Sequence, residues 1–249
     1  MNETLRTIHS LRTIHGNFSR REVTKQDLQI ILEAAMRAAN ASARQSYSIV
    51  VLEDRGEMKK LGYQGSKALV FCVDYTRIRD AAEFLRQPFH SREIVSFVTG
   101  FVDTVLAAQT AAIAAKSLGI DSMFTNCIHR VHLQSVYELL RLPKEDCFPV
   151  IELILGYPDR EPEYRKGRLS AKGIVHYGHY KRLSEEDLAG IVAEYDDEHR
   201  HLGLTTDWAE LGFRHYLDWF YEKWCGEIPQ EKQREFYKAL ADAGFLRND

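Results

Sequence analysis

One apolar stretch, residues 94–120, constrains the fold of this chain more than any other feature. It reads IVSFVTGFVDTVLAAQTAAIAAKSLGI and is long enough for a single continuous helix. Asp103, Gln109 and Lys116 interrupt it, which disfavours a membrane span and favours a helix buried in protein. One domain of ordinary size does not easily surround such a helix. We therefore expect a second subunit to supply some of its packing partners.

The sequence around this stretch predicts an α+β arrangement. Ser91 is expected to cap the long helix, and Gly119 to end it. Thr24, with Asp27 three residues later, predicts the start of an amphipathic helix that runs to about residue 39. Mostly apolar, β-rich runs predict strands over residues 47–54, 68–74, 120–125 and 148–156, and shorter helices are expected over residues 75–86 and 131–142.

From Ser184 onward the chain becomes helical in character. Three helices are expected, over residues 184–199, 206–226 and 229–245, around a small aromatic core of Trp208, Phe213, Trp219, Phe220 and Trp224. The sequence thus predicts a mixed sheet of about four strands flanked by helices in residues 1–183. A helical C-terminal extension is expected to follow in residues 184–249.

The composition is that of an ordinary soluble enzyme, with 45% hydrophobic and 28% charged residues over 249 positions. The formal net charge of −3 argues against a nucleic-acid binder that works by bulk electrostatics, and against a polybasic membrane anchor. The four cysteines form no C-x-x-C pair, and the N-terminus lacks the apolar core of a signal peptide. These features predict a reducing, cytoplasmic compartment.

Two basic segments are candidates for binding an anion. SLRTIHGNF carries Arg12, Thr13 and His15 just before the first amphipathic helix, and EYRKGRLS carries Lys166 and Arg168 after the strongest predicted strand. Arginine forks, hydroxyl groups and free backbone N–H groups suit a phosphate. Two separated basic clusters in an acidic protein suggest one shared anion, while two unrelated surface patches remain the alternative.

A third polar segment, NASARQSYSIVV (residues 40–51), joins a predicted helix to a strand. Its donors and acceptors could border a heteroaromatic ring, or it could be a plain connecting loop. The histidines at positions 176, 179, 199 and 201 lack the spacing of a known metal motif, so surface histidines are the favoured interpretation. Cys127 could be a reactive thiol, but a buried inert cysteine is favoured.

The order of these segments resembles the nitroreductase family of FMN-dependent oxidoreductases. The family's R-[HR]-S-x-[KR]-x-F element resembles RTIHGNF, its polar loop before a strand resembles NASARQSYSIVV, and its long apolar helix ends much like AAIAAKSLGIDS. Its closing l-G-y-P and K-x-R-L elements resemble ILGYP and KGRL. The resemblance covers about residues 5–183. It implies FMN as cofactor, NADH or NADPH as electron donor, and a homodimer whose two flavins each contact both chains.

The resemblance also implies which positions contact FMN. Arg12 and Thr13 correspond to residues that hold its phosphate and ribityl chain, and His15 to a cation near the pyrimidine end of the ring. Lys166 and Arg168 correspond to a second phosphate clamp. The residues implied around the isoalloxazine ring are Ser42, Arg44 and Gln45 at its border, with the backbone N–H groups of Asn126 and Cys127 at its N5 edge.

This sequence departs from the family pattern at several of these positions. Arg44 stands near the family's Asn, Ser46 and Tyr47 replace its Pro-Trp, and Asn17 looks like an insertion that can shift the alignment by one residue. The implied reaction passes hydride from NAD(P)H through the flavin to a small-molecule acceptor such as a nitroaromatic, a quinone or free flavin. No side chain is assigned as a catalytic acid or base, and no metal is expected.

Three alternatives remain open at this point. The first is another flavin chemistry on the same fold, namely a dehalogenase or a flavin-fragmenting relative. The second is a flavin-binding protein without turnover, whose C-terminal helices serve a partner. The third is a metal-dependent hydrolase built on the histidines. The sequence does not choose between NADH and NADPH, because the chain lacks a G-x-G-x-x-G fingerprint.

Overall fold

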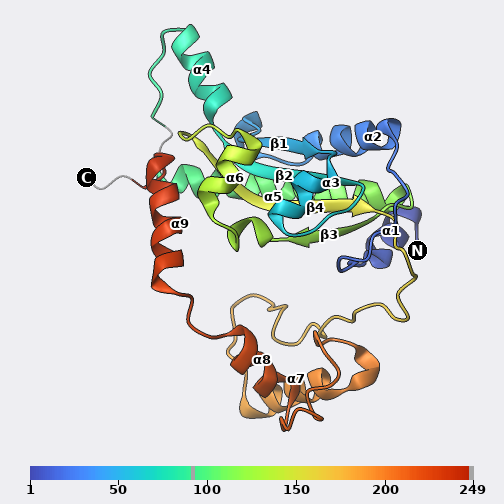
Figure 1. The fold of residues 1–249 in the computed structure, drawn as a ribbon. Helices are drawn as coiled ribbons and strands as arrows, with labels where there is room; N and C mark the ends of the chain where they lie inside the picture. The colour runs from blue at the N-terminus through green and yellow to red at the C-terminus, as the bar shows by residue number, and fades with distance from the viewer. Residues whose placement is uncertain (91–92, 247–249) are drawn as a thin grey trace. The chain divides into compact units, whose positions relative to one another are not determined.

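A four-stranded sheet in the order β1-β2-β4-β3 organises the larger of two compact units (Figure 1). The computed structural model describes residues 1–90 and 93–246. Unit 1 consists of Met1–Glu161 and Gln230–Asp249, and unit 2 of Pro162–Pro229. These bounds differ from the expected division after residue 183, because residues 162–183 belong to unit 2 and the last helix to unit 1. The assignment of FMN binding to residues 1–183, with a helical extension in residues 184–249, stays a prediction.

The predicted strands are confirmed as β1 (Tyr47–Leu52), β2 (Lys67–Asp74), β3 (Asp121–Thr125) and β4 (Cys147–Gly156). All three ladders between them are antiparallel. The sequence predicts a mixed sheet, with both parallel and antiparallel pairs. Within the described residues, the one parallel pairing is the isolated bridge between Thr13 and Ser122. The N-terminal segment therefore lies along the outer edge of β3.

Helices cover both faces of the sheet. On one face α2 (Lys25–Met36) and α5 (Ile94–Ser117) pack against β-strand side chains such as Phe71 and Leu153. On the other face α3 (Arg55–Leu61) and α6 (Leu133–Leu140) cover residues such as Val70 and Ile154. Both central strands are buried on both faces, which explains why they read as nearly continuous apolar runs.

Side-chain caps determine where several helices begin. The Thr24 hydroxyl accepts the Asp27 N–H at 3.0 Å and starts α2, as the sequence predicts. Asp54 caps α3 and Asn2 caps α1 (Glu3–Ser10), two helices that the sequence patterns do not predict. Ser91, the predicted cap of α5, lies outside the described residues, and the residue before α5 is Glu93. The shorter α4 spans Thr76–Phe84.

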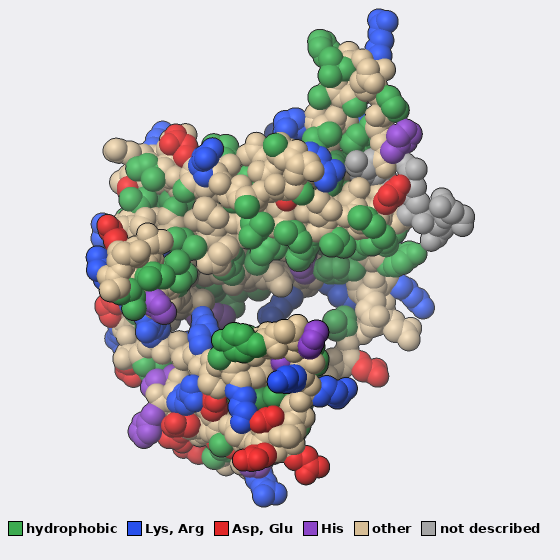
Figure 2. Space-filling model, turned by 180° about the vertical axis from the view of Figure 1, so that it is seen from behind, with side chains coloured by type: hydrophobic (Ala, Val, Ile, Leu, Met, Phe, Trp, Pro, Cys, Tyr) green, Lys and Arg blue, Asp and Glu red, His purple; other side chains and the backbone are tan. Residues whose placement is uncertain are grey.

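The two faces of α5 differ in side-chain size. Its buried face consists mostly of small residues, among them Gly100, Ala107 and Ala111, which let the helix lie close to the sheet. Its other face leaves large apolar residues exposed, and Figure 2 shows apolar side chains gathered across this side of unit 1: Ile94, Val95, Val98, Phe101, Val102, Val105 and Leu106. In the described chain, α5 alone is long and apolar enough to cross a membrane, a test that core helices of soluble proteins also pass.

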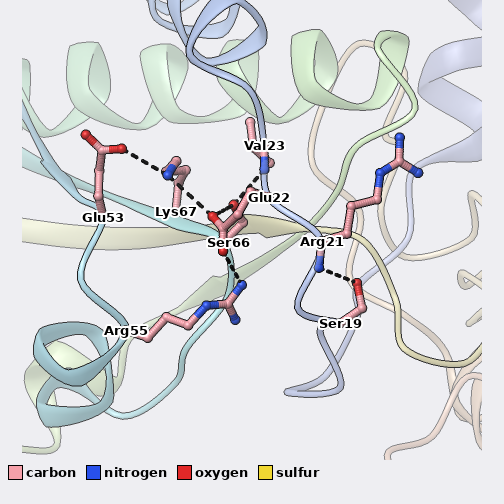
Figure 3. Close-up of polar contacts among 8 residues, drawn as sticks. All are labelled: Ser19, Arg21, Glu22, Val23, Glu53, Arg55, Ser66 and Lys67. Carbon is pink, nitrogen blue, oxygen red and sulfur yellow. Dashed lines mark hydrogen bonds and ion pairs between the residues drawn. The ribbon is translucent and has the colours of Figure 1, made fainter.

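A polar network fastens the chain entering α2 to the start of β2 (Figure 3). The Glu22 carboxylate accepts from Arg55 and from the Ser66 hydroxyl, both at 2.7 Å. Ser66 in turn accepts the Val23 N–H at 2.7 Å, and the nearly buried Lys67 pairs with Glu53 at 2.9 Å. These contacts fix the backbone just after the N-terminal basic segment.

Unit 2 contains α7 (Glu185–Asp196), the short η3 (Glu198–Arg200) and α8 (Tyr216–Trp224). The expected helix over residues 206–226 was too long, because the chain forms turns until the His215–Asp218 capping box starts α8. Tyr216 is the buried centre of the aromatic cluster and contacts Tyr195, Trp219 and Phe220, whereas the predicted core residue Trp224 is 51% exposed.

The last helix, α9 (Gln230–Asp242), belongs to unit 1. Its Phe236 and Leu240 pack with a cluster that includes Phe148 of β4 and Tyr75. The Glu235 carboxylate accepts the Leu133 N–H at the start of α6, and Lys232 donates to the Val131 carbonyl at 2.7 Å. Apolar packing and the cap of α6 thus hold α9 against the rest of unit 1.

Candidate functional site

The 40–46 loop, which precedes β1, has a strained backbone. It contains the single turn η1 (Ala41–Ala43), and three of its residues have positive φ angles: Ser42 at 53°, Ala43 at 55° and Gln45 at 48°. Non-glycine residues seldom adopt this left-handed region, and such strain persists only where the surroundings enforce it. Three strained residues within four positions indicate a loop shaped for binding.

Asp103 of α5 holds this loop in place. Its side chain is buried, with the residue only 1% exposed, and its two oxygens accept the Ala41 N–H at 2.8 Å and the Ser46 N–H at 3.3 Å. Asp103 was noted in the sequence only as an interruption of the apolar helix. An acidic residue within a buried apolar helix needs a polar partner, and that requirement is the signal that could have identified it.

The loop leaves polar atoms available for a ligand. The Arg44 Nε and the Ser46 Oγ are buried and find no hydrogen-bond partner in the described chain. Arg77 donates to the carbonyls of Arg44 at 3.0 Å and Gln45 at 2.7 Å, which restrains the end of the loop. Gln45 and Arg77 also line a cavity of about 550 Å³ beside α2 and β1, whose other walls include Leu32, Met36 and Ile49. A largely apolar cavity with a few fixed polar groups suits a flat heteroaromatic ring.

The N-terminal segment gathers a second set of the predicted residues at the other edge of the sheet. Its Ile14 N–H donates to the Ser122 carbonyl at 3.2 Å, so Thr13 and His15 flank β3. The His15 ring lies 5.5 Å from the Tyr63 ring. Gly62, next to Tyr63, lies so close to Cys127 that a Cβ at Gly62 would stand 2.7 Å from the Cys127 Cβ. The exposed Asn126 precedes Cys127, so His15 and Cys127 approach the adjacent residues Tyr63 and Gly62.

Arg12 is engaged by carboxylates. Its Nη2 contacts Asp121 at 2.6 Å and its Nη1 contacts Glu161 at 2.7 Å, and Lys116 also contacts Asp121 at 2.6 Å. Hydrogen bonds to Asp121 and Glu161 raise the pKa of Arg12. Burial raises the pKa of Asp121, but the hydrogen bonds from Arg12 and Lys116 outweigh it, so this pKa lies below its ordinary value. Arg12 is thus a fixed cation, and an anion that binds it has to share it with Glu161.

Lys166 and Arg168 lie in unit 2, on an exposed segment that contacts a second loop of that unit. The Lys166 ammonium donates to the Gly203 carbonyl, and burial lowers the pKa of Lys166. The Arg168 guanidinium donates to the Gly167 carbonyl at 2.7 Å. Both side chains retain N–H groups that could donate to a phosphate.

Within unit 1 the predicted residues form two groups rather than one. The group of Ser42, Arg44 and Gln45 precedes β1, and the group of Thr13, His15, Asn126 and Cys127 borders β3. Because β1 and β3 are the two edges of the sheet, with β2 and β4 between them, about 14 Å of sheet separates the groups.

A buried carboxyl lies beside the second group. Glu152 of β4 pairs in register with Thr125 of β3, is fully buried, and its two oxygens find no partner among the residues described. Burial raises the pKa of Glu152 to about 8, so it is mostly protonated at neutral pH. The strand pattern could have located it, because a single Glu interrupts the apolar run FPVIELILG.

Two further features of the described chain lie apart from the predicted residues. A cavity of about 540 Å³ between α6 and α9 is lined by charged residues of both signs, including Lys144, Arg234 and Glu231, and contains none of the predicted residues. A search of the residues that the structure describes finds no group of three His, Cys, Asp or Glu side chains arranged to hold a metal.

Comparison with known proteins identifies the family. The chain is 32% identical over 197 residues to an NADPH-flavin oxidoreductase of Vibrio harveyi, a match that covers 76% of this chain and 79% of that protein. It is 31% identical over 219 residues to an oxygen-insensitive NADPH nitroreductase of Salmonella typhimurium, covering 82% and 84% of the two chains. No family model matches the sequence.

Solved structures show the same fold. NfrA2 of B. megaterium superposes with a TM-score of 0.85 at 26% identity and 100% coverage of both chains. The NADPH:FMN oxidoreductase of Vibrio harveyi, solved in complex with NAD⁺, gives a TM-score of 0.79 at 25% identity, covering 99% and 100%. These similarities confirm the α+β fold and the resemblance that the sequence indicates. The chain belongs to the nitroreductase family, and it is an FMN-dependent NAD(P)H oxidoreductase.

Proposed function

We propose that this chain works as a cytoplasmic homodimer in which FMN binds between the subunits and passes electrons from NAD(P)H to a small oxidised acceptor. The observation that carries the proposal is the 40–46 loop, strained in three residues and anchored by the buried Asp103. Strain of this kind is retained where it serves binding. The four free cysteines agree with a reducing compartment.

The loop residues fit the flavin ring chemically. An isoalloxazine edge presents carbonyl oxygens and ring nitrogens, which need both donors and acceptors. The buried Arg44 Nε offers an N–H and the Ser46 Oγ a hydroxyl, and neither has a partner within the described residues. The cavity beside Gln45 is mostly apolar. Arg44 would thereby donate a guanidinium N–H to the ring edge, near the position where the family has an Asn.

The cationic residues fit the phosphate end. Arg12 and Thr13 of unit 1 would contact the phosphate and ribityl chain. The family resemblance gives Lys166 and Arg168 of unit 2 the role of a second phosphate clamp. His15, which lies against Tyr63, would be near the pyrimidine end, and the backbone N–H groups of Asn126 and Cys127 would face the N5 edge. A hydrogen-bond donor there would favour the reduced flavin, which carries negative charge.

The homodimer is supported by two observations. The exposed face of α5 carries seven large apolar residues, among them Val98 and Val102, whereas a soluble monomer seldom leaves so large a patch in water. In addition, about 14 Å of sheet separates the 40–46 loop from the group that borders β3. Two chains packed through α5 could bring the loop of one subunit to the N-terminal segment of the other.

FMN, when bound, would supply the redox chemistry that carries electrons from NAD(P)H to the acceptor. The protein's residues would bind and orient it and exclude water around the ring. No side chain needs to act as a nucleophile. The acceptor class includes nitroaromatics and free flavin, as the names of the relatives suggest: NADPH-flavin oxidoreductase, FMN reductase and NADPH nitroreductase. The family resemblance adds quinones to this class.

Reconstitution tests this proposal directly. Purified protein would be incubated with excess FMN, passed through a desalting column, and analysed by sedimentation for flavin content and mass. We expect one FMN per chain, carried by a species of twice the chain mass. A flavin-free protein, or one that retains FMN as a monomer, would contradict the proposal. Steady-state assays with nitrofurazone, a quinone and FMN as acceptors would then identify the preferred class.

A further inference from the structure

The basic segment of unit 2 is shaped by a second loop of the same unit, residues 200–204. The Gly167 N–H donates to the His201 carbonyl at 3.2 Å. A Cβ at Gly167 would lie 2.0 Å from the Arg200 carbonyl oxygen, which leaves no room for a side chain. Gly167 therefore lets two backbones meet between the two cationic residues Lys166 and Arg168.

Side chains strengthen this contact. The Tyr164 ring stacks on the His201 ring at 3.8 Å between centroids and 10° between planes. The Lys166 ammonium lies 5.5 Å from the centre of the Tyr164 ring and donates to the Gly203 carbonyl. Long cationic side chains lose considerable rotamer freedom when a ligand orders them. Contacts that order Lys166 beforehand reduce this entropic cost of binding.

Tyr216 holds the 200–204 loop in turn. Its ring fills the space beside Gly203, where a Cβ would stand 2.6 Å from the ring. Its hydroxyl accepts the Leu204 N–H at 3.0 Å, and its own N–H donates to Asp196 at 2.8 Å. Tyr216 is only 3% exposed. Asp196 ends α7 and Tyr216 begins α8, so the junction of the two helices fixes the loop.

We propose that Tyr216 and the 200–204 loop form a template that presents Lys166 and Arg168, side by side, to a phosphate group. This inference rests on the proposed function for the identity of the phosphate, which would be that of FMN. It gives the helical part of unit 2 a role, namely positioning the phosphate clamp. Tyr216 and His201 act through Lys166 and Arg168 and are positioning residues.

Tyr216→Phe tests the template, with Tyr221→Phe as the matched control. Tyr221 lies on the same helix but is 59% exposed. Amide hydrogen exchange in the full-length protein without flavin measures how well Gly167 is held. Binding of FMN and of riboflavin, which lacks the phosphate, measures the role of the clamp. Loss of the hydroxyl should accelerate Gly167 exchange about tenfold and weaken FMN binding about fivefold, with riboflavin binding unchanged.

Each outcome decides a different point. Faster Gly167 exchange and an FMN-specific loss in Tyr216→Phe, but not in Tyr221→Phe, would support the template. Unchanged Gly167 exchange would overturn it, whatever the flavin data. Equal losses of FMN and riboflavin binding would show a general structural role and would also overturn it. Wild-type protein that binds neither flavin would refute the proposed function, while the exchange result would still decide whether the contacts form a template.

Discussion

Asp103 and Glu152 are both buried carboxyl residues of unit 1, but they differ in what their oxygens contact. Asp103 accepts two backbone N–H groups from the 40–46 loop. Glu152 has no hydrogen-bond partner within residues 1–90 and 93–246, although it lies in the middle of the sheet. Burying a carboxyl is costly unless hydrogen bonds compensate it. Asp103 thus stabilises a shaped loop, whereas Glu152 weakens the sheet and gains nothing from its neighbours.

The difference shows that an acidic residue within an apolar segment can have two different structural roles. An acidic residue in an apolar helix and one in an apolar strand look alike in the sequence. Only the structure shows that the first supports the candidate ring site and that the second stays protonated. Removing each carboxyl should therefore change the free energy of unfolding in opposite directions.

Asp103→Ala should produce the largest effect. It leaves the Ala41 and Ser46 N–H groups without their acceptor and frees the strained loop, so we expect about 4 kcal/mol less free energy of unfolding. FMN binding should fall at least 100-fold as the loop relaxes. Urea denaturation and fluorescence titration measure the two quantities.

Asp103→Asn is the control for that change. It keeps one oxygen acceptor, so it should cost about 1 kcal/mol and leave most of the FMN affinity. Equal losses in both variants would mean that both acceptor oxygens are needed to shape the loop.

Glu152→Gln should stabilise the protein. Because burial raises the pKa of Glu152 from its ordinary 4.5 to about 8, the folded state holds a proton that the unfolded chain releases above pH 4.5. Glu152 therefore does not change the free energy of unfolding with pH below pH 4.5, and it lowers that free energy as the pH rises from 4.5 through 8. The variant should therefore gain about 3 kcal/mol at pH 7 and nothing at pH 4. Urea denaturation at both pH values checks this, and a pH-independent difference would contradict it.

Val102→Glu tests the face of α5 opposite Asp103. Val102 is 50% exposed, although it is the sequence neighbour of a residue that is 1% exposed. If that face lies in a dimer interface, a charge there should weaken dimerisation at least 100-fold, or about 2.7 kcal/mol. Sedimentation velocity measures it, with Ser135→Glu on the exposed side of α6 as control. A Val102→Glu variant that stays dimeric would place the interface elsewhere.

Arg12→Ala should have the smallest effect, because Arg12 already shares its charge with two carboxylates. We expect FMN binding to weaken by about 1 kcal/mol, less than the full value of a charge-assisted hydrogen bond, and riboflavin binding to stay the same. The exposed Arg20→Ala is the control. Unchanged FMN affinity would assign the phosphate to other residues.

Much of the fold could be predicted from the sequence because local signals agree with packing there. The Thr24 cap, the apolar run of β4 and the length of α5 each depend on neighbouring residues alone. The chain over residues 206–215 was misread as helix, since its aromatic residues suggested a buried face while turns precede the His215–Asp218 box. The burial of Tyr216 and the return of α9 to unit 1 depend on contacts distant in sequence.

The candidate site shows the same limit. Motif order located the loop, the N-terminal segment and the basic segment, but not what holds each one. Asp103, Tyr63 and the 200–204 loop come from other parts of the chain, and only the fold brings them into contact. The pairing of Arg12 with Glu161 likewise depends on the path of the chain after β4.

An anaerobic absorption spectrum of the FMN-loaded protein, before and after NADH or NADPH is added, tests whether this chain is an NAD(P)H oxidoreductase. We expect a flavin absorption band that bleaches stoichiometrically with at least one donor and returns when a quinone or nitroaromatic is added. A bound flavin that neither donor bleaches would contradict the assignment as an NAD(P)H oxidoreductase.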